Sequence, residues 1–242
     1  MVEPMRTLAK AAVKARTKPG SKTAVQPIEK LGDRALRTRD KIKLAAARLL
    51  NERGYHELRV QDVTERAGVA AGLFYRYFHD LREIVHEVST DFMAELNART
   101  SLLPDVVHPY DQIFERHALA VRMFTANPGI LRCLFQLDGD YPEFGQVWKS
   151  AAHEWNLQVA SMLNTSARLP RVQAERMAFV LGAMTEGVFF QYLIRHTEDL
   201  SVIGQTPEGI AEILSVMWYR TIFLENPPRE KLRTGKALIG GS

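Results

Sequence analysis

The stretch that most constrains the fold lies between residues 60 and 78, where two short helices meet at a glycine. The first helix carries apolar residues at helical spacing, at Val60, Val63 and Ala67. It runs into Gly68, which can adopt the positive φ that ends a helix. A second helix of about two turns then begins at Val69 and puts two phenylalanines one turn apart. Two short helices joined in this way form a helix-turn-helix, whose second helix fits the major groove of DNA.

An aromatic cluster, Phe74-Tyr75-Arg76-Tyr77-Phe78, closes this stretch and makes the prediction of a DNA-binding helix-turn-helix much more specific. From Arg39 to Val88 the sequence resembles the TetR/AcrR family of bacterial transcription regulators. The residues that carry the resemblance are Ala45-Ala46-Ala47 through Gly54-Tyr55, Val63, Glu65-Arg66-Ala67-Gly68-Val69, Gly72, Phe74-Tyr75 and Tyr77-Phe78. Beyond about residue 90 the likeness is architectural only, that of an all-helical chain of the expected length.

The rest of the chain carries helix signals and no strand-period segment with hairpin chemistry. We expect an all-α fold of about nine helices. Residues 1–36 are expected to form a basic, disordered arm, 37–88 a three-helix DNA-binding domain, 89–228 a helical effector-binding and dimerisation domain, and 229–242 a flexible tail. Asp80 and Glu83 have capping-box spacing and mark the start of a long helix that links the first domain to the second.

The charge is concentrated at the N-terminus. Residues 1–37 hold nine Lys/Arg against three Asp/Glu, a net +6, whereas the whole chain carries +4. This placement favours a polyanionic partner. The arm either follows DNA phosphates or a groove, or is a solvated tail with no role, and the sequence leaves both open.

The single cysteine, Cys133, excludes an intramolecular disulfide and suits a reducing cytosol. It is expected to be a small core residue, with a redox sensor as the alternative. No apolar run follows the basic N-terminus as a secretory signal would require, so we expect a cytoplasmic protein.

The resemblance implies a DNA-binding surface at the turn and the second helix. The candidate residues are Arg59, Gln61, Ala70, Ala71, Gly72, Leu73, Tyr75, Arg76, Tyr77 and Arg82. Arginine and tyrosine can contact phosphates, Arg76 can pair with guanine, and the alanines and Leu73 can pack on thymine methyls. For the tyrosines the alternative is core packing, and we favour the phosphate contact for Tyr77. For Arg76 the alternative is a solvated side chain, and both remain open.

This surface departs from the family pattern at several positions. Arg59 stands where a Ser/Thr usually caps the helix, Ala70 and Ala71 where Ser and Lys/Arg are common, Leu73 where Ser/Thr is usual, and Leu81 where Lys is usual. Hydrogen-bonding and ionic groups are therefore missing from the expected DNA face.

The resemblance also implies a ligand pocket among the middle helices. Its candidate residues are Phe114, His117, Arg122, Trp148, Trp155, Glu186, Phe189 and Phe190, with Phe124, Phe135, His153, Phe179 and Gln191 as further members. A pocket lined by these side chains would take a hydrophobic or amphipathic effector. For each residue the alternative is ordinary core packing, and for Glu186 it is an ion pair or a place at the dimer seam.

The segment Met177 to Ile194 is apolar nearly all the way round and must be covered on all sides. It has 18 residues, and Glu186 at its middle would cost about 2.5–3.5 kcal/mol in a bilayer, so we do not expect a membrane span. We expect a second copy to cover it, with Gly182, Gly187, Ile213, Met217 and Trp218 at the interface. A two-fold dimer reads a palindrome, and a monomer with an ordinary core is the alternative.

Together these features predict a ligand-responsive, sequence-specific transcription regulator, most often a repressor in this family. The alternative is an all-helical small-molecule-binding protein without specific operator binding. The sequence has no nucleophile elbow, zincin motif, P-loop, dinucleotide fingerprint or Cys/His metal spacing, so we expect no enzyme, cofactor or metal. It leaves open the effector, the operator, and whether regulation is repression or activation.

Overall fold

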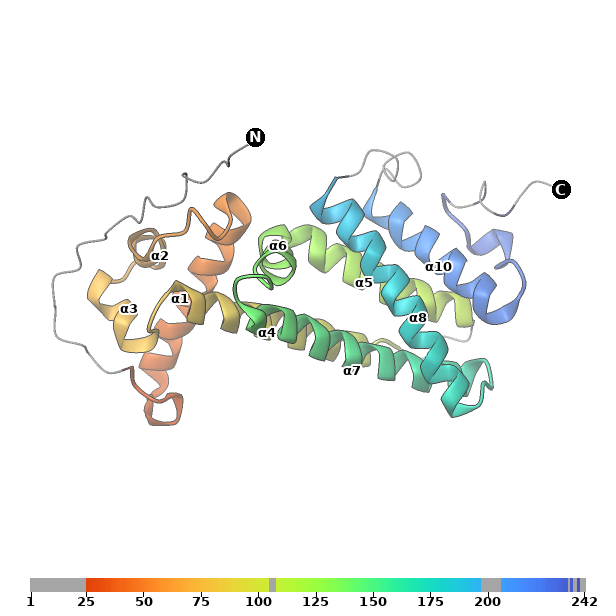
Figure 1. The fold of residues 1–242 in the computed structure, drawn as a ribbon, viewed down its shortest axis with the longest axis horizontal. Coiled ribbons are helices and arrows are strands. Elements are labelled where there is room, and N and C mark those ends of the chain that lie inside the picture. Colours follow the sequence, from red (N-terminus) through yellow and green to blue (C-terminus); the bar gives the residue numbers. More distant parts are fainter. Residues whose placement is uncertain (1–24, 105–107, 197–205, 235, 237–238, 240–242) are drawn as a thin grey trace, which may run out of the picture.

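The computed structural model describes residues 25–104, 108–196, 206–234, 236 and 239, and within these ranges the chain is helical without strands (Figure 1). Its α-helices are α1 (Asp33–Arg53), α2 (Val60–Ala67), α3 (Ala71–Tyr77), α4 (Leu81–Ser101), α5 (Pro109–Ala126), α6 (Pro128–Gln136), α7 (Pro142–Ser166), α8 (Arg171–Phe189) and α10 (Pro207–Phe223). Short turns of 3-10 helix lie at Ile28–Lys30 and Arg229–Lys231, and α8 continues as a π-helical turn over Phe190–Ile194. The predicted all-α class is confirmed.

A compact head at one end of the elongated molecule holds α1, α2 and α3 (Figure 1). Helix α1 begins at Asp33, so residues 33–36, expected in the disordered arm, are helical. Leu31, only 9% exposed, joins the core just before this helix and explains the earlier start. Residues 1–24 of the predicted arm lie outside the described residues.

The turn between α2 and α3 has the glycine geometry that the sequence predicts. Gly68 has φ +66° and ψ +38°, the left-handed conformation that costs glycine little. Its N–H bonds to the Glu65 carbonyl, and the next N–H, of Val69, bonds to the Thr64 carbonyl. This is the Schellman pattern, which ends α2 and turns the chain into α3.

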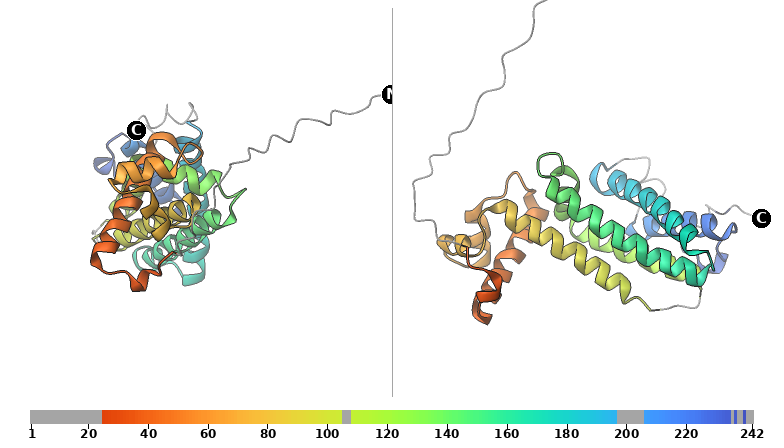
Figure 2. Two further views of the ribbon diagram at one scale, coloured as in Figure 1. Left: turned by 90° about the vertical axis from the view of Figure 1, so that its left-hand side faces the viewer. Right: turned by 60° about the horizontal axis from the view of Figure 1, so that its bottom comes forward.

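Helix α4 connects the head to the body, and its start is the predicted one. The Asp80 carboxylate accepts from the Glu83 N–H at 2.8 Å, and the Glu83 carboxylate accepts in return from the N–H of His79. Both bonds satisfy donors at the helix start that would otherwise be unpaired. From there α4 runs into the body beside α7 (Figure 2).

In the body, α5 packs along α10, α7 packs along α8, and the aromatic core lies between these pairs. The tail after α10 does not match the expectation of flexibility over its first residues. Leu232 is 3% exposed, and the buried Glu212 carboxylate of α10 accepts from the backbone N–H groups of Arg233 and Thr234. Residues 229–234 are therefore held against α5 and α10.

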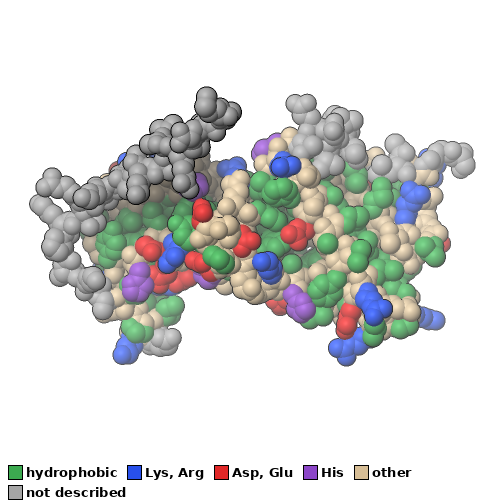
Figure 3. All heavy atoms as spheres, viewed as in Figure 1, with side chains coloured by type: hydrophobic (Ala, Val, Ile, Leu, Met, Phe, Trp, Pro, Cys, Tyr) green, Lys and Arg blue, Asp and Glu red, His purple; other side chains and the backbone are tan. Residues whose placement is uncertain are grey.

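Helix α8 and its π-helical continuation, Arg171–Ile194, are long and apolar enough to cross a membrane by length and composition. Only 28% of their apolar window is buried within the chain. Val180 is 71% exposed, and Phe179 and Met184 are 37% and 36% exposed. Apolar side chains gather over this region in the space-filling view (Figure 3). The single chain thus leaves an apolar face of α8 uncovered.

Candidate DNA-binding surface and ligand cavity

Helix α3 divides into a buried side and an exposed side. Phe74 is fully buried in the head core, and Phe78, just after the helix, is buried beside it with ring centroids 5.6 Å apart. On the other side Tyr75 is 48% exposed. Exposed side chains also include Arg59, Gln61, Ala70, Ala71, Arg76 and Arg82, and Gly72 lies exposed with open space around it. Most of the predicted DNA-contacting residues therefore share the solvent side of α2 and α3.

Two of the predicted contacts need correction. Tyr77 is only 4% exposed, so its ring packs in the head core, and the phosphate contact that we favoured for it is at most a contact of its hydroxyl edge. Tyr75 is the exposed tyrosine of the pair. Leu73 is half-buried against the core and does not stand free for a thymine methyl. The helix register explains both, because Leu73 and Tyr77 lie four residues apart on the same inward edge.

Arg76 lies against the segment that precedes α1. Its Nε donates to the side-chain oxygen of Gln26 at 3.0 Å, and the Gln26 N–H donates to the Arg76 carbonyl at 3.1 Å. Gln26 therefore lies beside the C-terminal end of α3. No sequence pattern predicts this contact, because Gln26 lies 50 residues from Arg76 in a stretch without apolar periodicity.

Arg82 sits at the joint between head and body. Its guanidinium lies 5.5 Å from the centre of the Tyr141 ring, and its Nε lies 3.6 Å from the carboxylate of Glu143 in α7. Tyr55 meets Tyr141 across the same joint, and burial together with Tyr141 raises the pKa of Tyr55 to about 12. A contact between Arg82 and phosphate would compete with these groups of the body.

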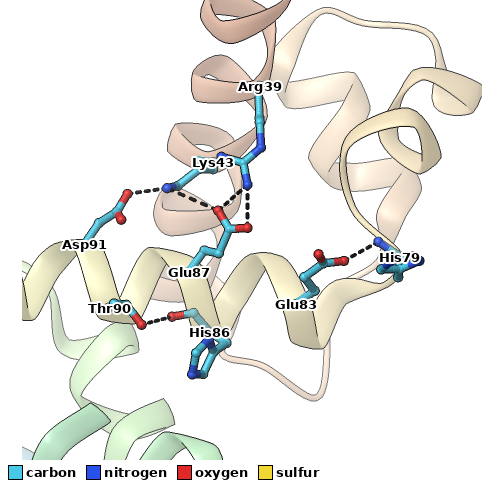
Figure 4. A network of polar contacts seen from close by, with 8 residues as sticks. All are labelled: Arg39, Lys43, His79, Glu83, His86, Glu87, Thr90 and Asp91. Carbon is cyan, nitrogen blue, oxygen red and sulfur yellow. Dashed lines mark hydrogen bonds and ion pairs between the residues drawn. The ribbon is translucent and has the colours of Figure 1, made fainter. Parts of the chain in front are cut away.

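An ion-pair cluster fixes α1 to α4 (Figure 4). Both carboxylate oxygens of Glu87 accept from the guanidinium of Arg39, which is 6% exposed. Lys43 pairs with Glu87 and Asp91 on the same side. The Arg39 guanidinium also lies 4.7 Å from the centre of the Phe78 ring. The Arg39 guanidinium of α1 thus contacts α4 through Glu87 and the turn after α3 through Phe78.

A cavity of about 510 Å³ lies in the body between α4, α5, α6, α7 and α8. Six aromatic side chains line it: Phe124, Phe135, Trp148, Trp155, Phe179 and Phe189. The polar and charged side chains that line it are Asn97, Asp138, Lys149, His153, Asn156, Thr185 and Glu186. Its size and its mostly apolar wall are those of a small-molecule site.

The cavity differs from the predicted pocket at five positions. Of the predicted residues, those that line it are Trp148, Trp155, Glu186, Phe189 and the further members Phe124, Phe135, His153 and Phe179; those that do not are Phe114, His117, Arg122, Phe190 and Gln191. Phe114 packs under the guanidinium of Arg233, 5.1 Å from its ring centre, and Arg122 lies on a separate groove beside α1. Phe190 lies beyond the end of α8, in the π-helical turn, with its ring centre 5.5 Å from that of Phe135 and the ring planes tilted by 57°. Phe114, His117 and Arg122 are on α5, which lines the cavity, but on another part of that helix.

His117 lies one layer behind the cavity. Its ring is 5.0 Å from that of Trp218 and 6.3 Å from that of Trp155. Its Nδ1 lies 3.0 Å from the hydroxyl of Ser215, which donates its own proton to the Ala211 carbonyl at 2.6 Å. The hydroxyl must therefore accept from His117, and the ring is neutral with its proton on Nδ1. Burial lowers the pKa of His117 to about 3.

Helix α6 touches both the cavity and the head. Leu134 and Phe135 line the cavity, and at the other end of the helix the Gly129 N–H donates to the side-chain oxygen of Asn51 at 2.8 Å. A Cβ on Gly129 would lie 2.2 Å from the Leu50 carbonyl oxygen, which is far inside van der Waals contact. Only glycine lets the start of α6 sit on the end of α1.

The predicted interface residues point in different directions. Met217, 40% exposed, and Gly187, also exposed, lie at the surface, and Ile213 is half-buried. Trp218 is 1% exposed and donates to the Thr185 hydroxyl, so it belongs to the core of the single chain. Gly182 faces α7, where a Cβ would lie 2.2 Å from the Asn156 side-chain oxygen. Trp218 and Gly182 are thus corrected from interface to interior.

Cys133 is buried, and burial raises the pKa of its thiol to about 12. A thiol with this pKa is protonated at neutral pH and reacts slowly, which agrees with a core role. Among the described residues, no group of three or more His, Cys, Asp or Glu side chains is placed to hold a metal ion.

Residues 42–88, which form most of the head and include α2, α3 and the start of α4, match the family model described as bacterial regulatory proteins, tetR family. The chain is also 28% identical over 197 residues to the HTH-type transcriptional regulator TtgR of Pseudomonas putida, an alignment that covers 76% of this chain and 92% of that protein.

Several solved structures share the fold at low sequence identity. A transcriptional regulator from Rhodococcus is 16% identical with a TM-score of 0.64, over 77% of this chain and 96% of that one. The regulator FadR of Bacillus subtilis, solved with stearoyl-CoA, is 17% identical with a TM-score of 0.53, over 73% of this chain and 97% of that one. The arrangement of head and body is therefore an established fold.

Proposed function

We propose that this chain is a member of the TetR family of bacterial regulatory proteins and acts as a homodimeric repressor that a ligand releases from a palindromic operator. It is a transcription regulator and not an enzyme. The observation that carries the finer proposal is the division of α3, with its phenylalanine in the core and Tyr75 and Arg76 exposed on the outer side. We assign residues 37–88 to DNA binding and 89–228 to dimerisation and ligand binding, in the cytoplasm.

DNA contacts are assigned to the exposed side of α2 and α3. Ala71 and Gly72 have almost no side chain, so the start of α3 can approach the floor of the major groove closely. Tyr75 and Arg76 then extend from the next turn, where tyrosine can donate to phosphate and arginine can pair with guanine. Arg59 and Gln61 at the start of α2 offer further donors to the backbone of the duplex.

Dimerisation is assigned to the exposed face of α8 together with that of α10. Val180, Met184 and Gly187 are exposed at helical spacing along α8, and Met217 is exposed on α10. A second copy would remove this apolar area from water. Two heads related by a two-fold axis would contact half-sites about 34–36 Å apart, or a multiple of this distance.

Ligand control is assigned to the cavity and to α6. A ligand that presses on Phe135 acts on the same rigid helix that touches α1 through Gly129. Because α1 is fixed to α4 by the Arg39–Glu87 pair, a shift of α6 would move the head as a unit. The related fold of Bacillus subtilis FadR was solved with stearoyl-CoA, which supports a ligand with a large apolar part.

A second candidate function is ligand binding without a specific operator. The observation that favours it is the shortage of polar groups on the outer side of α3, where Ala70, Ala71 and Gly72 stand in sequence. Binding of this kind would rest on the arginines alone and would depend on salt but not on sequence.

A fluorescence-anisotropy titration distinguishes the two. Purified protein is titrated into labelled DNA from upstream of its own gene and into random DNA, each at two salt concentrations. The repressor proposal expects selective binding with two subunits per site, and an Arg76→Ala variant that loses at least about tenfold in affinity for the upstream DNA. Equal, salt-sensitive binding to both DNAs would favour the second candidate.

A further inference from the structure

We infer that the cavity takes an elongated, uncharged aromatic ligand with a hydrogen-bond acceptor at one end, which binds Trp148, and a donor at the other, which binds Asn156. This inference rests on the proposed ligand-binding role of the cavity and narrows the ligand class. Four features of the described residues carry it: the aromatic wall, two unsatisfied polar atoms, their spacing along α7, and the charges around them.

The wall is aromatic from end to end. Phe135 lies against Trp148 with ring centroids 4.6 Å apart, and Phe124 lies against Phe189 at 5.4 Å. The aliphatic lining residues Met93, Leu96 and Leu134 close the side formed by α4 and α6. Flat faces at several angles hold a ring better than a flexible chain, because ring–ring contacts add to the burial of apolar area.

Two polar side chains of α7 line this cavity, and each has one buried polar atom without a hydrogen-bond partner. Trp148 is 9% exposed, and its indole N–H is buried without a partner. Asn156 is 8% exposed, and its side-chain oxygen is buried without a partner as well. Leaving such a buried group unpaired is unfavourable, so each is a place where a ligand gains by supplying the missing partner.

The two groups require opposite chemistry. The Trp148 indole is a donor only and needs an acceptor such as a ketone or ether oxygen. The Asn156 oxygen is an acceptor and needs a hydroxyl or an N–H. A ligand with one group of each kind satisfies both, whereas an aliphatic hydrocarbon satisfies neither.

Their spacing fixes the shape of the ligand. Trp148 and Asn156 are eight residues apart on one helix, which corresponds to about 12 Å along its axis. Trp155 lines the cavity between them and Phe179 faces it from α8. A molecule of two or three rings, with its polar atoms at opposite ends, spans this distance along α7.

The charged lining residues select against an anionic ligand. Asp138 and Glu186 are half-buried, whereas Lys149, the single lysine among the described lining residues, is exposed. A carboxylate or phosphate in the cavity would meet two carboxylates and lose its own hydration. An uncharged ligand has neither cost.

Matched probes test the inference by calorimetry on the full chain without DNA. The reference probe is a biphenyl with a para-acetyl group on one ring and a para-hydroxyl group on the other, so its ketone and its hydroxyl lie at opposite ends. One analogue replaces its carbonyl by a methylene and another lacks its hydroxyl. The wild-type protein is expected to bind each analogue about tenfold more weakly than the reference probe, the effect of one lost hydrogen bond in a dry site.

Two variants assign the anchors. Trp148→Phe keeps the ring, removes the N–H, and should abolish the preference for the ketone over the methylene analogue. Asn156→Ala should abolish the preference for the reference probe over the analogue without the hydroxyl, and it should keep the preference for the reference probe over the methylene analogue. Trp155→Phe is the matched control, since its indole N–H is not among the buried unpartnered atoms, and it should weaken all three probes alike.

The inference is overturned if the three probes bind the wild-type protein equally, if none binds, or if the preferences survive in Trp148→Phe and Asn156→Ala. Because the calorimetry contains no DNA, its result is separate from the proposed operator binding. A protein that prefers the ketone but binds no operator would refute the proposed function and keep this inference.

Discussion

The buried imidazole of His117 gives a pH dependence of stability with a definite sign. Burial first, and the neighbouring charge of Arg116 second, lower its pKa from 6.5 to about 3 in the folded chain. In the unfolded chain the His117 imidazole keeps the higher pKa, so it takes up a proton in a pH range where the folded chain does not. The contribution of His117 to the free energy of unfolding is therefore fully present above pH 6.5. It is lost as the pH falls toward 3, by up to about 1.4 kcal/mol per pH unit.

The variant His117→Gln removes this titration. Between pH 7 and pH 5 we expect the wild-type protein to lose about 2 kcal/mol more of its unfolding free energy than the variant does. Urea unfolding at both pH values measures the difference. The same pH dependence in both proteins would show that His117 is protonated normally in the folded state.

The guanidinium of Arg39 should contribute more to stability than an exposed arginine. It is 6% exposed, pairs with both oxygens of Glu87 and lies over the Phe78 ring. Because Arg39→Ala leaves Glu87 half-buried without this partner, we expect a loss of about 2–4 kcal/mol. Arg99→Ala, which breaks an exposed pair with Glu95, should cost less than about 1 kcal/mol. Similar losses in the two variants would contradict this account.

For single residues of the cavity, the sequence predicts the chemistry of a side chain better than the direction in which it points. Trp148, Trp155, Glu186 and Phe189 were predicted for the cavity, and they line it. Asn156 and Thr185 were not predicted. Thr185 is a polar residue in the mostly apolar segment Met177 to Ile194, which is a signal that would have found it, whereas Asn156 stands between Glu154 and Gln158 and gives no such signal. The direction of His117 could not be predicted, because it depends on Ser215, 98 residues away.

Among the elements, α6 lines the cavity at one end and contacts the head at the other. Gly129→Ala places a Cβ 2.2 Å from the Leu50 carbonyl oxygen, and backbone on both sides prevents an easy adjustment. We expect α6 to move off α1 and the midpoint of thermal unfolding to fall by several degrees, with at least a severalfold loss of operator affinity.

Gly139→Ala is the matched control for this prediction, because a Cβ there meets nothing within 4 Å. It should leave both measurements close to the wild-type values. If Gly129→Ala also left operator affinity unchanged, α6 would not be the connection between the cavity and the head.

Helix starts and stops were predictable where local chemistry sets them. The turn at Gly68 and the cap at Asp80 are both in place. Residues 33–36 were assigned to the arm and not to α1, because the burial of Leu31 against the head is a tertiary effect. The docked residues 229–234 were missed for the same reason, since Glu212 holds them from another helix.

For the whole molecule, the proposed dimer depends on the uncovered face of α8. Val180 is 71% exposed at the middle of that face, so Val180→Arg should place a charge in the interface and yield monomers. Leu102→Arg is the control, because Leu102 is 83% exposed at the end of α4. Light scattering after size exclusion gives the mass of each variant. A dimeric Val180→Arg protein would mean that the interface lies elsewhere.

The most direct test of the account is the affinity for an operator whose half-sites have been moved apart. Anisotropy titration compares the protein's own upstream site with the same DNA carrying five extra base pairs at its centre. About half a helical turn puts the second half-site on the opposite face of the duplex, out of reach of a two-fold dimer. We expect affinity to fall at least about a hundredfold, toward that for random DNA. Unchanged affinity would contradict the account, because each head would then bind DNA without the other.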